Sequence, residues 1–337
     1  MFKLVTLEQW LNRLKLNPND YISIDSDVAV EKYEEKPLNF KRESIFVRWI
    51  KHLLPWYTKI GLKVRDFLDP PHFTVRSDFG MYFKFLGRKM LKLMGLAFLN
   101  KNMREMHKFK NIHKGERCFI TCTGPSLTID DLNLLKNEIT FGVNSITKAY
   151  PFTDWRPTYY VLVDAYAYGE ILKKEEVYGG KFCEKYSFLH YRIDPKTKNG
   201  NEHYCLINYS NHWKYRMDKG IIKICDDPAI GLFDCFTVTN MAISLAAYMG
   251  FKDIYIIGAD ATYKLEKTHF IEGEWEKIHK KAQRGLALAV QRSMVGYIKV
   301  KQHYNRKGIN IYNATRGGML EIFPRADLDE ILNKKED

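Results

Sequence analysis

The chain has 337 residues, of which 45% are hydrophobic and 28% are charged, and its formal net charge is +13. This composition is normal for a folded soluble protein. No uncharged apolar run approaches the roughly 20 residues that a membrane-spanning helix needs, and the N-terminus lacks the apolar core and cleavage site of a signal peptide. The six cysteines show no CxxC spacing, which excludes a zinc knuckle and a redox pair. We therefore expect a cytoplasmic protein with reduced, buried thiols.

The first 113 residues form a basic region with helical patterns and no strand–helix alternation. Residues 51–114 contain 14 Lys and Arg against 4 Asp and Glu, so this segment holds +10 of the net charge. Two interpretations are open. The pattern favours a helical extension that packs on the main domain and leaves a basic face in water. Alternatively, the basic, aromatic-rich helices lie on an anionic membrane surface, at the inner face of the cytoplasmic membrane. No nucleic-acid-binding module is visible, and nucleic acid is not an expected partner.

After residue 114 the chain alternates apolar strand patterns with helical patterns. Near-continuous apolar strands separated by helices predict a parallel sheet that is covered on both faces. We expect residues 114–337 to form a Rossmann-like α/β domain with a doubly wound, mostly parallel sheet. The predicted strands are 117–122, 139–143, 158–163, 186–190, 221–225, 253–257 and 309–312, and the predicted helices are 127–137, 165–174, 238–249, 276–305 and 327–333.

Polar residues follow several of these strands at the point where each strand ends. In a doubly wound sheet the ligand lies beyond the carboxyl ends of the strands. Asn and Asp also suit turns, so any single position has an ordinary structural explanation, but five such ends at one edge predict a nucleotide-like site. The residues are Thr123, Gly124, Pro125 and Ser126 after the first strand, Asn144 and Ser145 after the second, Asp164 after the third, Asp260 after the sixth and Asn313 after the last.

The turn at 123–126 connects a buried strand to a helical pattern. A turn of this kind offers backbone N–H groups and a helix N-terminus, which together attract phosphate. It contains a single glycine, Gly124, and so lacks the GxGxxG dinucleotide fingerprint, and the chain has no GxxxxGK[ST] phosphate loop. Near the C-terminus, Arg316 precedes two glycines and is predicted either to bind a phosphate or donor carboxylate or to pair with Glu321 or a helix end.

Several motifs, taken in order, resemble one superfamily. They are CTGPSL, ITFGVNSI, WRPTYYVLVDA, FTVTNMAISLAAYMGFKDIYIIGADATY, THF and INIYNATRGGMLEIFPRADLDEIL. The segment 114–333 resembles the motility-associated (Maf-type) flagellin glycosyltransferases and the 6-hydroxymethylpterin pyrophosphokinase-like proteins. It is also similar to the CMP-sialic acid-dependent sialyltransferases of bacteria. The first third of the chain shows no such resemblance.

The resemblance implies roles for particular residues. It implies that Gly124, Pro125, Ser126 and Asn144 hold the nucleotide and its phosphate. Thr237 and Thr239 would line the donor pocket, and Asp260 and Tyr263 would lie near the phosphate or sugar. The catalytic His would be His269. Many relatives have Asn where this chain has Thr123, so the nucleotide base is not assigned.

The expected reaction is metal-independent transfer of a sugar, a nonulosonic acid from a CMP donor, to a hydroxyl of a glycan or protein. A His with a pKa near neutral suits the deprotonation of an acceptor hydroxyl, and no cofactor is expected. Two alternatives stay open. One is a magnesium- and ATP-dependent diphosphotransferase of the pterin type, for which Asp164, Asp226 and Asp260 would supply carboxylates. The other is a non-catalytic module that binds a nucleotide sugar or polymer. The oligomeric state is not predicted.

Overall fold

The computed structural model describes six parts of the chain, and its first 74 residues lie outside them. Residues 75–81 and 283–291 are described by their backbone alone. The described parts are 75–163, 182–190, 201–212, 221–261, 270–271 and 283–333.

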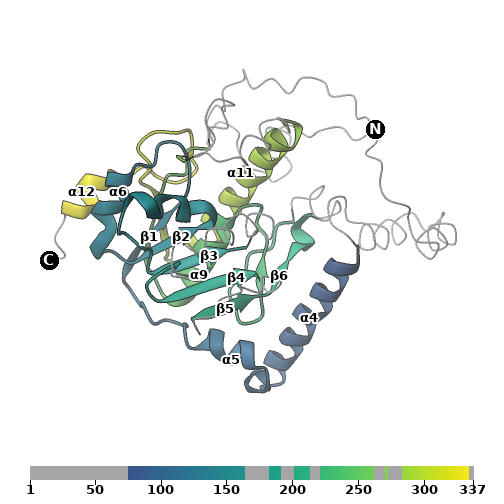
Figure 1. The fold of residues 1–337 in the computed structure, drawn as a ribbon. Coiled ribbons are helices and arrows are strands. Elements are labelled where there is room, and N and C mark those ends of the chain that lie inside the picture. Colours follow the sequence, from purple (N-terminus) through teal and green to yellow (C-terminus); the bar gives the residue numbers. More distant parts are fainter. Residues whose placement is uncertain are drawn as a thin grey trace.

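Seven parallel strands form the central sheet, in the order β5-β4-β3-β2-β1-β8-β9 (Figure 1). Strand β1 lies inside the sheet. The chain runs outward from it to β5 and then returns to the other side of β1 to add β8 and β9. The doubly wound α/β prediction is therefore confirmed. The strands are β1 (Arg117–Thr121), β2 (Thr140–Val143), β3 (Tyr159–Leu162), β4 (Tyr186–His190), β5 (Glu202–Cys205), β8 (Asp253–Ile257) and β9 (Asn310–Asn313).

Helices cover both faces of the sheet, because the inner strands are apolar on both sides. Along β1, Cys118 and Ile120 belong to one buried cluster and Phe119 belongs to the other. The first cluster includes residues of α9 (Val238–Met249) and α11 (Gln283–Asn305). The second includes residues of α6 (Ile129–Leu134) and α12 (Leu328–Asn333), together with the 3-10 segments η3 (Leu135–Asn137) and η4 (Asn144–Phe152).

Helix α9 is the best-defined helix of the domain and shows why the sequence begins and ends it there. Thr237 is its N-cap, and its hydroxyl accepts a hydrogen bond from the backbone of Thr239. Gly250 ends it in the left-handed conformation, with φ +98°. Since α9 leads into β8, its N-terminus lies at the carboxyl edge of the parallel sheet.

The described part of the basic extension packs on the sheet through helices α4 (Val75–Leu93) and α5 (Lys101–His107), joined by the 3-10 turn η2 (Ala97–Leu99). Met103 and Met106 of α5 are each 1% exposed. Helix α4 runs beside the two-stranded ribbon β6 (Ile207–Asn208) and β7 (Leu232–Phe233), with Phe85 and Phe233 centroids 5.1 Å apart. The domain boundary at residue 114 stays a prediction.

The predicted strand at 221–225 is wrong, because these residues have no strand structure. Side chains, not a neighbouring strand, take up its backbone groups. Asn211, at the end of the 3-10 segment η5 (Tyr209–His212), bonds both the N–H and the carbonyl of Lys223, and the Tyr304 hydroxyl donates to the carbonyl of Cys225 at 2.7 Å. Strands β5, β6 and β7 were not predicted, and the predicted helix at 165–174 lies outside the described residues.

All six cysteines are buried and none forms a disulfide, as predicted. Burial raises the pKa of the Cys122 and Cys205 thiols to about 12. Such thiols stay protonated near neutral pH and serve as packing groups. Over the described residues, no helix combines the length and apolarity that a bilayer crossing requires.

Candidate functional site

The switch in strand order lies between β1 and β8, because the chain leaves β1 in one direction and returns on its other side. In open α/β sheets, the crevice beyond the carboxyl ends of the strands at such a point is where ligands bind. The register pairs Thr121 of β1 with Gly142 of β2 and with Ile257 of β8. The residues that follow these three strands therefore meet at one place.

The backbone N–H groups of the turn after β1 are hydrogen-bonded within the protein. Gly124 N–H donates to the carbonyl of Gly258 at 2.7 Å, and Leu127 N–H donates to the carbonyl of Gly124. Ser126 N–H donates to the Asp260 carboxylate at 3.3 Å, and Pro125 has no N–H. Within 124–127 each N–H therefore already has a protein acceptor, and phosphate binding by the turn at 123–126 stays a prediction.

The helix after the turn also differs from the expected anion site. Helix α6 has six residues and begins at Ile129, with Thr128 as N-cap. Thr128 and Asp131 form a capping box that satisfies two backbone N–H groups. Its first turn carries Asp130 and Asp131, which complement the helix dipole and disfavour a second anion. The first turn of α6 is therefore a poor anion site by itself.

Asp260 joins the ends of β1 and β8 across the switch point. It is 6% exposed, and its Oδ2 accepts the Ser126 hydroxyl at 2.9 Å. Its carbonyl accepts the N–H of Met319 at 2.6 Å. Gly124 and Gly318 make this approach possible, because a Cβ on Gly124 would lie 2.1 Å from Asp260 Oδ2 and one on Gly318 would lie 2.5 Å from Asp260 Cα. The predicted residues Gly124, Ser126 and Asp260 are therefore in contact.

Asn144 directly follows β2 and has a strained backbone conformation. Its φ is +42°, which non-glycine residues adopt rarely and Asn more readily than most. Its carbonyl accepts the hydroxyl of Tyr160 at 2.5 Å, and burial raises the pKa of that tyrosine well above its usual value. The side-chain Oδ1 of Asn144 is buried and has no hydrogen-bond partner. An unpaired buried acceptor is costly, and a strained residue of this kind often marks a functional site. Ser145 follows it in η4.

The N-terminus of α9 contributes hydroxyls to the same edge. Thr239 Oγ1 lies 3.3 Å from Cys122 Sγ, next to the turn after β1. Phe236, just before the N-cap Thr237, has φ +70°. The contact of Thr239 places the N-terminus of α9 beside the residues that follow β1, and a role of Thr237 and Thr239 in lining a donor pocket stays a prediction.

Sequence reasoning missed a polar residue on α11. Arg292 precedes Ser293, whose hydroxyl donates to the carbonyl of Phe236 at 3.4 Å. The Nε of Arg292 is buried without a partner, and burial lowers the pKa of its guanidinium while Asp234 opposes this. Arg292 gave no signal in the sequence, because it is one of several basic residues in the α11 pattern.

Arg316 follows β9 and forms ion pairs within the protein. Its Nε donates to Asp131 at 2.6 Å, and its two other nitrogens donate to Asp329 at 2.7 and 2.8 Å. These bonds raise its pKa. Glu321, the partner weighed from the sequence, pairs with Arg325 instead. Arg316 thus ties α6 to α12, and a role in binding a ligand stays a prediction.

Three predicted site residues, Asp164, Tyr263 and His269, lie outside the described residues. The chain is described again at Phe270, the residue after His269. There the N–H of Phe270 donates to the carbonyl of Thr123 at 3.0 Å. The turn after β1 is therefore also the anchor for Phe270.

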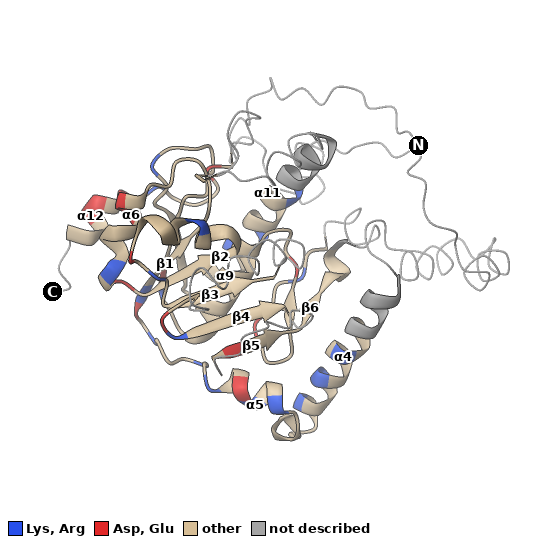
Figure 2. Ribbon diagram, in the orientation of Figure 1, with Lys and Arg blue, Asp and Glu red and all other residues tan. Residues whose placement is uncertain are grey.

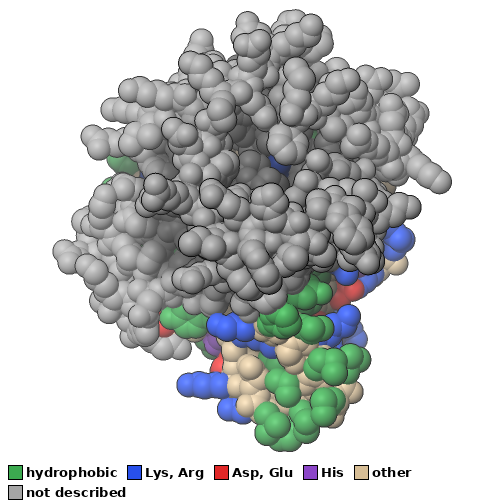
Figure 3. All heavy atoms as spheres, turned by 90° about the vertical axis from the view of Figure 1, so that its right-hand side faces the viewer, with side chains coloured by type: hydrophobic (Ala, Val, Ile, Leu, Met, Phe, Trp, Pro, Cys, Tyr) green, Lys and Arg blue, Asp and Glu red, His purple; other side chains and the backbone are tan. Residues whose placement is uncertain are grey.

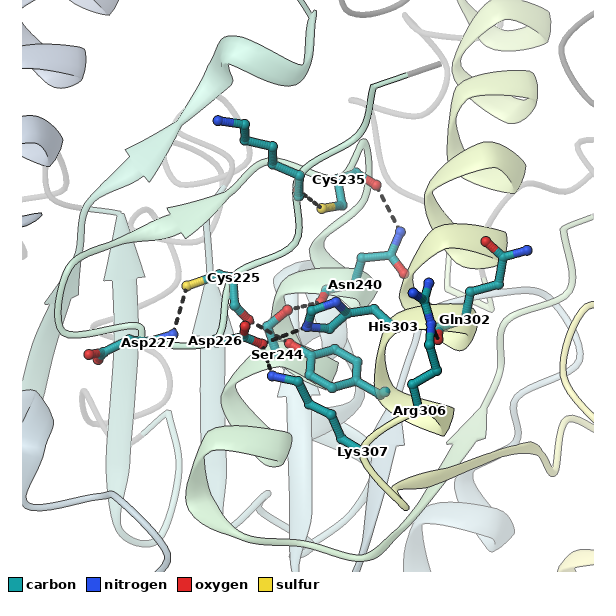
Figure 4. Close-up of polar contacts among 12 residues, drawn as sticks. Cys225, Asp226, Asp227, Cys235, Asn240, Ser244, Gln302, His303, Arg306 and Lys307 are labelled. Carbon is teal, nitrogen blue, oxygen red and sulfur yellow. Dashed lines mark hydrogen bonds and ion pairs between the residues drawn. The ribbon is translucent and has the colours of Figure 1, made fainter. Parts of the chain in front are cut away.

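Asp226 lies at the opposite edge of the sheet. It pairs with His303, in the last turn of α11, and with Lys307, which lies between α11 and β9 (Figure 4). Strands of four or five residues, about 3.3 Å each, separate this edge from Asp260. Asp226 and Asp260 therefore do not share a metal site. Among the described residues, no group of three or more His, Cys, Asp and Glu side chains is placed to hold a metal ion.

Comparison with solved structures gives distant likenesses. The Maf glycosyltransferase from Magnetospirillum magneticum AMB-1 aligns with 68% of this chain at 15% identity and a TM-score of 0.43, and the chain spans 38% of its length. The sialyltransferase CstII from Campylobacter jejuni, in complex with cytidine-5'-monophosphate, aligns with 66% of this chain and 89% of its own at 13% identity and a TM-score of 0.40.

No curated protein matches the chain. The model of one protein family, described as 6-hydroxymethylpterin diphosphokinase MptE-like, matches residues 94–266. This match spans just over half of the 337 residues and includes β1 to β8 with the turn at 123–126, Asn144 and Asp260. The chain therefore belongs to the 6-hydroxymethylpterin diphosphokinase MptE-like family.

Proposed function

We propose that the chain is a metal-independent glycosyltransferase that transfers a sugar, a nonulosonic acid from a CMP donor, to a hydroxyl of a glycan or protein. The observation that carries the proposal is Asn144, whose buried Oδ1 has no protein partner and whose φ is +42°. An amide held in strain at the switch point suits a ligand that donates a hydrogen bond, such as the amino group of a cytosine.

The neighbouring groups support the rest of the donor. Thr237 and Thr239 lie at the N-terminus of α9, a helix of 12 residues whose dipole favours an anion there. The hydrogen-bonded turn at 124–127 leaves this helix as the better phosphate site at this edge. The Asp260 carboxylate accepts the Ser126 hydroxyl through Oδ2, and we propose that Oδ1 accepts a ribose or sugar hydroxyl.

The chemical step needs a base for the acceptor hydroxyl. We propose His269, since a His with a pKa near neutral suits that task, and Phe270, the next residue, is held at the turn after β1. The proton of the acceptor hydroxyl passes to the imidazole, and the acceptor oxygen bonds to the anomeric carbon. The bond from that carbon to the phosphate oxygen breaks, and CMP leaves. Nearby hydroxyls and the α9 N-terminus stabilise its charge.

A diphosphotransferase is the second candidate, because the description of the family names a diphosphokinase. That reaction uses ATP with magnesium, which oxygen ligands from carboxylates would hold. Asp226 is on the opposite edge from Asp260 and cannot join it in such a site. This disfavours the set of three carboxylates without removing Asp164 or Asp260 from consideration.

Thermal unfolding with CMP, UDP, GDP and ATP, each with and without magnesium, separates these candidates. A ligand at 100 times its Kd stabilises the folded state by about 2.7 kcal/mol. We expect CMP to raise the Tm without magnesium. A shift that needs ATP together with magnesium would favour the diphosphotransferase.

Replacing the proposed base tests the chemical step. In the His269→Ala variant, transfer should fall about 10²- to 10⁴-fold while the CMP-induced shift stays, because the base contacts the acceptor and not the donor. His303→Gln, at the opposite edge, is the matched control and should keep full transfer. Transfer at the parent rate in His269→Ala would move the base to Asp164 or Asp260. If the parent and the variant both bind CMP and neither transfers sugar, a binding module is favoured.

A further inference from the structure

Helix α4 and the turn η2 carry an exposed apolar surface at one end of the molecule. Figure 3 shows these side chains gathered at its lower end, with Lys and Arg around them. Of the twelve large hydrophobic side chains that are exposed among the described residues, seven lie between 83 and 99. Leu93 is 72% exposed and Phe98 is 58% exposed. The apolar tip consists of Phe83, Leu86, Met90, Leu93, Met94, Phe98 and Leu99.

The apolar tip is separate from the face by which α4 packs on the domain. The inner face contributes Phe85, which contacts Phe233, and Leu91, which packs on the main core. At about 100° per residue, Phe83, Leu86, Met90 and Leu93 fall on one outward stripe roughly 80° wide. A helix with one face on a domain normally presents polar residues to water on the other. Within the part of the chain that the structure describes, the outward stripe therefore lies outside the buried core.

Basic residues surround the apolar tip and no acidic residue interrupts it in the sequence. Residues 79–104 contain six Lys and Arg and no Asp or Glu. By the same helical spacing Lys89 borders the outward stripe, whereas Lys84 falls on the inner side near Leu91. Lys92 reaches back to Asp227 of the domain. Figure 2 shows basic residues along the described part of α4.

We propose that the apolar tip inserts into the surface of an anionic lipid bilayer, with Lys89 at the level of the headgroups. An apolar face bordered by lysines is the pattern of a helix that lies in the membrane interface. A second copy of the chain is a poorer occupant, because it would bring an equally basic surface against this one. The proposal does not depend on the glycosyltransferase assignment, and its test requires no enzymatic activity.

The test is co-sedimentation of the full chain with vesicles of phosphatidylcholine alone and of phosphatidylcholine with phosphatidylglycerol. We expect binding to the anionic vesicles and partial release as salt rises, because salt screens the attraction of the lysines. Each lysine removed near the surface should weaken binding about fivefold. The Lys89→Gln variant should therefore bind about fivefold more weakly than the Lys136→Gln control, whose side chain is exposed outside the tip.

The apolar contribution is tested separately. Leu93→Ser/Phe98→Ser should weaken vesicle binding roughly tenfold or more. Phe152→Ser is the matched control, since Phe152 is 64% exposed but lies in η4, and it should bind as the parent does. An unchanged Tm shows that each variant is folded. Parent-like binding by Leu93→Ser/Phe98→Ser would overturn the proposal. The proposal would also be overturned if the parent formed dimers in sedimentation equilibrium and these two substitutions dissociated them. The apolar tip would then join two copies of the chain.

Discussion

The two edges of the sheet are built differently. At the amino edge, charged side chains form ion pairs: Arg117 pairs with Glu138, and Asp226 pairs with His303 and Lys307. At the carboxyl edge, three residues other than glycine have positive φ, namely Asn144, Phe236 and Ala261. The fourth such residue in the described parts of the chain, Asn111, is exposed at the amino edge.

We propose that this difference separates groups that stabilise the fold from groups that bind a ligand. A paired surface charge adds little to stability, but it leaves nothing unsatisfied. A buried acceptor without a partner lowers stability, and it is retained where something other than folding selects for it. Asn144 at the carboxyl edge has both strain and such an acceptor.

The largest effect is expected from Gly124→Ala. The new Cβ would lie 2.1 Å from Asp260 Oδ2 and 2.5 Å from the carbonyl of Gly258, so the crossing between β1 and β8 must open. We expect a loss of about 1–3 kcal/mol of unfolding free energy, measured in denaturant, together with loss of the CMP-induced shift. Gly87→Ala, in α4 with no atom within 4 Å of the added Cβ, is the control and should be neutral or stabilising. Parent-like stability of the Gly124→Ala variant would contradict a close, rigid contact of Gly124 with Gly258 and Asp260.

Asn144→Gly should raise stability and lower nucleotide binding together. Glycine accepts φ +42° without strain, and the buried unpaired Oδ1 is removed, so we expect a gain of about 1 kcal/mol in unfolding free energy. Asn111→Gly is the matched control at the amino edge, where φ is +59° and the side chain is exposed. It should change stability by less and leave the CMP-induced shift intact. A destabilised Asn144→Gly variant that keeps the shift would show that Asn144 is structural.

The smallest effect concerns pH at the amino edge. Partial burial would raise the pKa of Asp226, but hydrogen bonds from Lys307 and His303 outweigh it and lower the pKa below the usual 3.8. A lowered pKa stabilises the fold above the unfolded value, and this contribution is lost as pH falls through the folded value. The Asp226 side chain is 53% exposed, so this contribution to the unfolding free energy is less than about 1 kcal/mol. Asp226→Asn should therefore lose less stability than the parent between pH 5 and pH 3 in denaturant titrations. Equal acid sensitivity would contradict this pairing.

Much of the fold could be predicted because the inner strands are continuous apolar runs. β1 and β8 are buried on both faces, so their residues needed no alternation to be recognised. The site followed from topology: residues after parallel strands meet at one edge, which brought Ser126, Asn144 and Asp260 together. Strands β5 to β7 were missed because runs of two to four residues are too short to show a period.

The rest of the site depends on contacts that no local pattern contains. The turn after β1 was expected to offer its backbone N–H groups to a phosphate. The carboxylate of Asp260, more than 130 positions away, accepts the hydrogen bond of the Ser126 N–H. Asp226 and Asp260 are 34 positions apart, and Asp226 was placed near Asp260 only by the wrong prediction of a strand at 221–225. Arg292 is one of several basic residues in the α11 pattern, and its buried Nε becomes noticeable once α11 is packed beside Phe236.

The packing of α5 on β5 bears on how the chain can be shortened. β5 is an edge strand, and the side-chain amide of Asn102 donates to its Tyr204 carbonyl at 2.8 Å. Phe109 meets the rings of Phe188 and His203 on the neighbouring strands. A fragment that begins at 114 would bare this strand edge and its aromatic face, and uncovered edges of this kind recruit other strands into aggregates. Expression fragments should therefore begin ahead of α4.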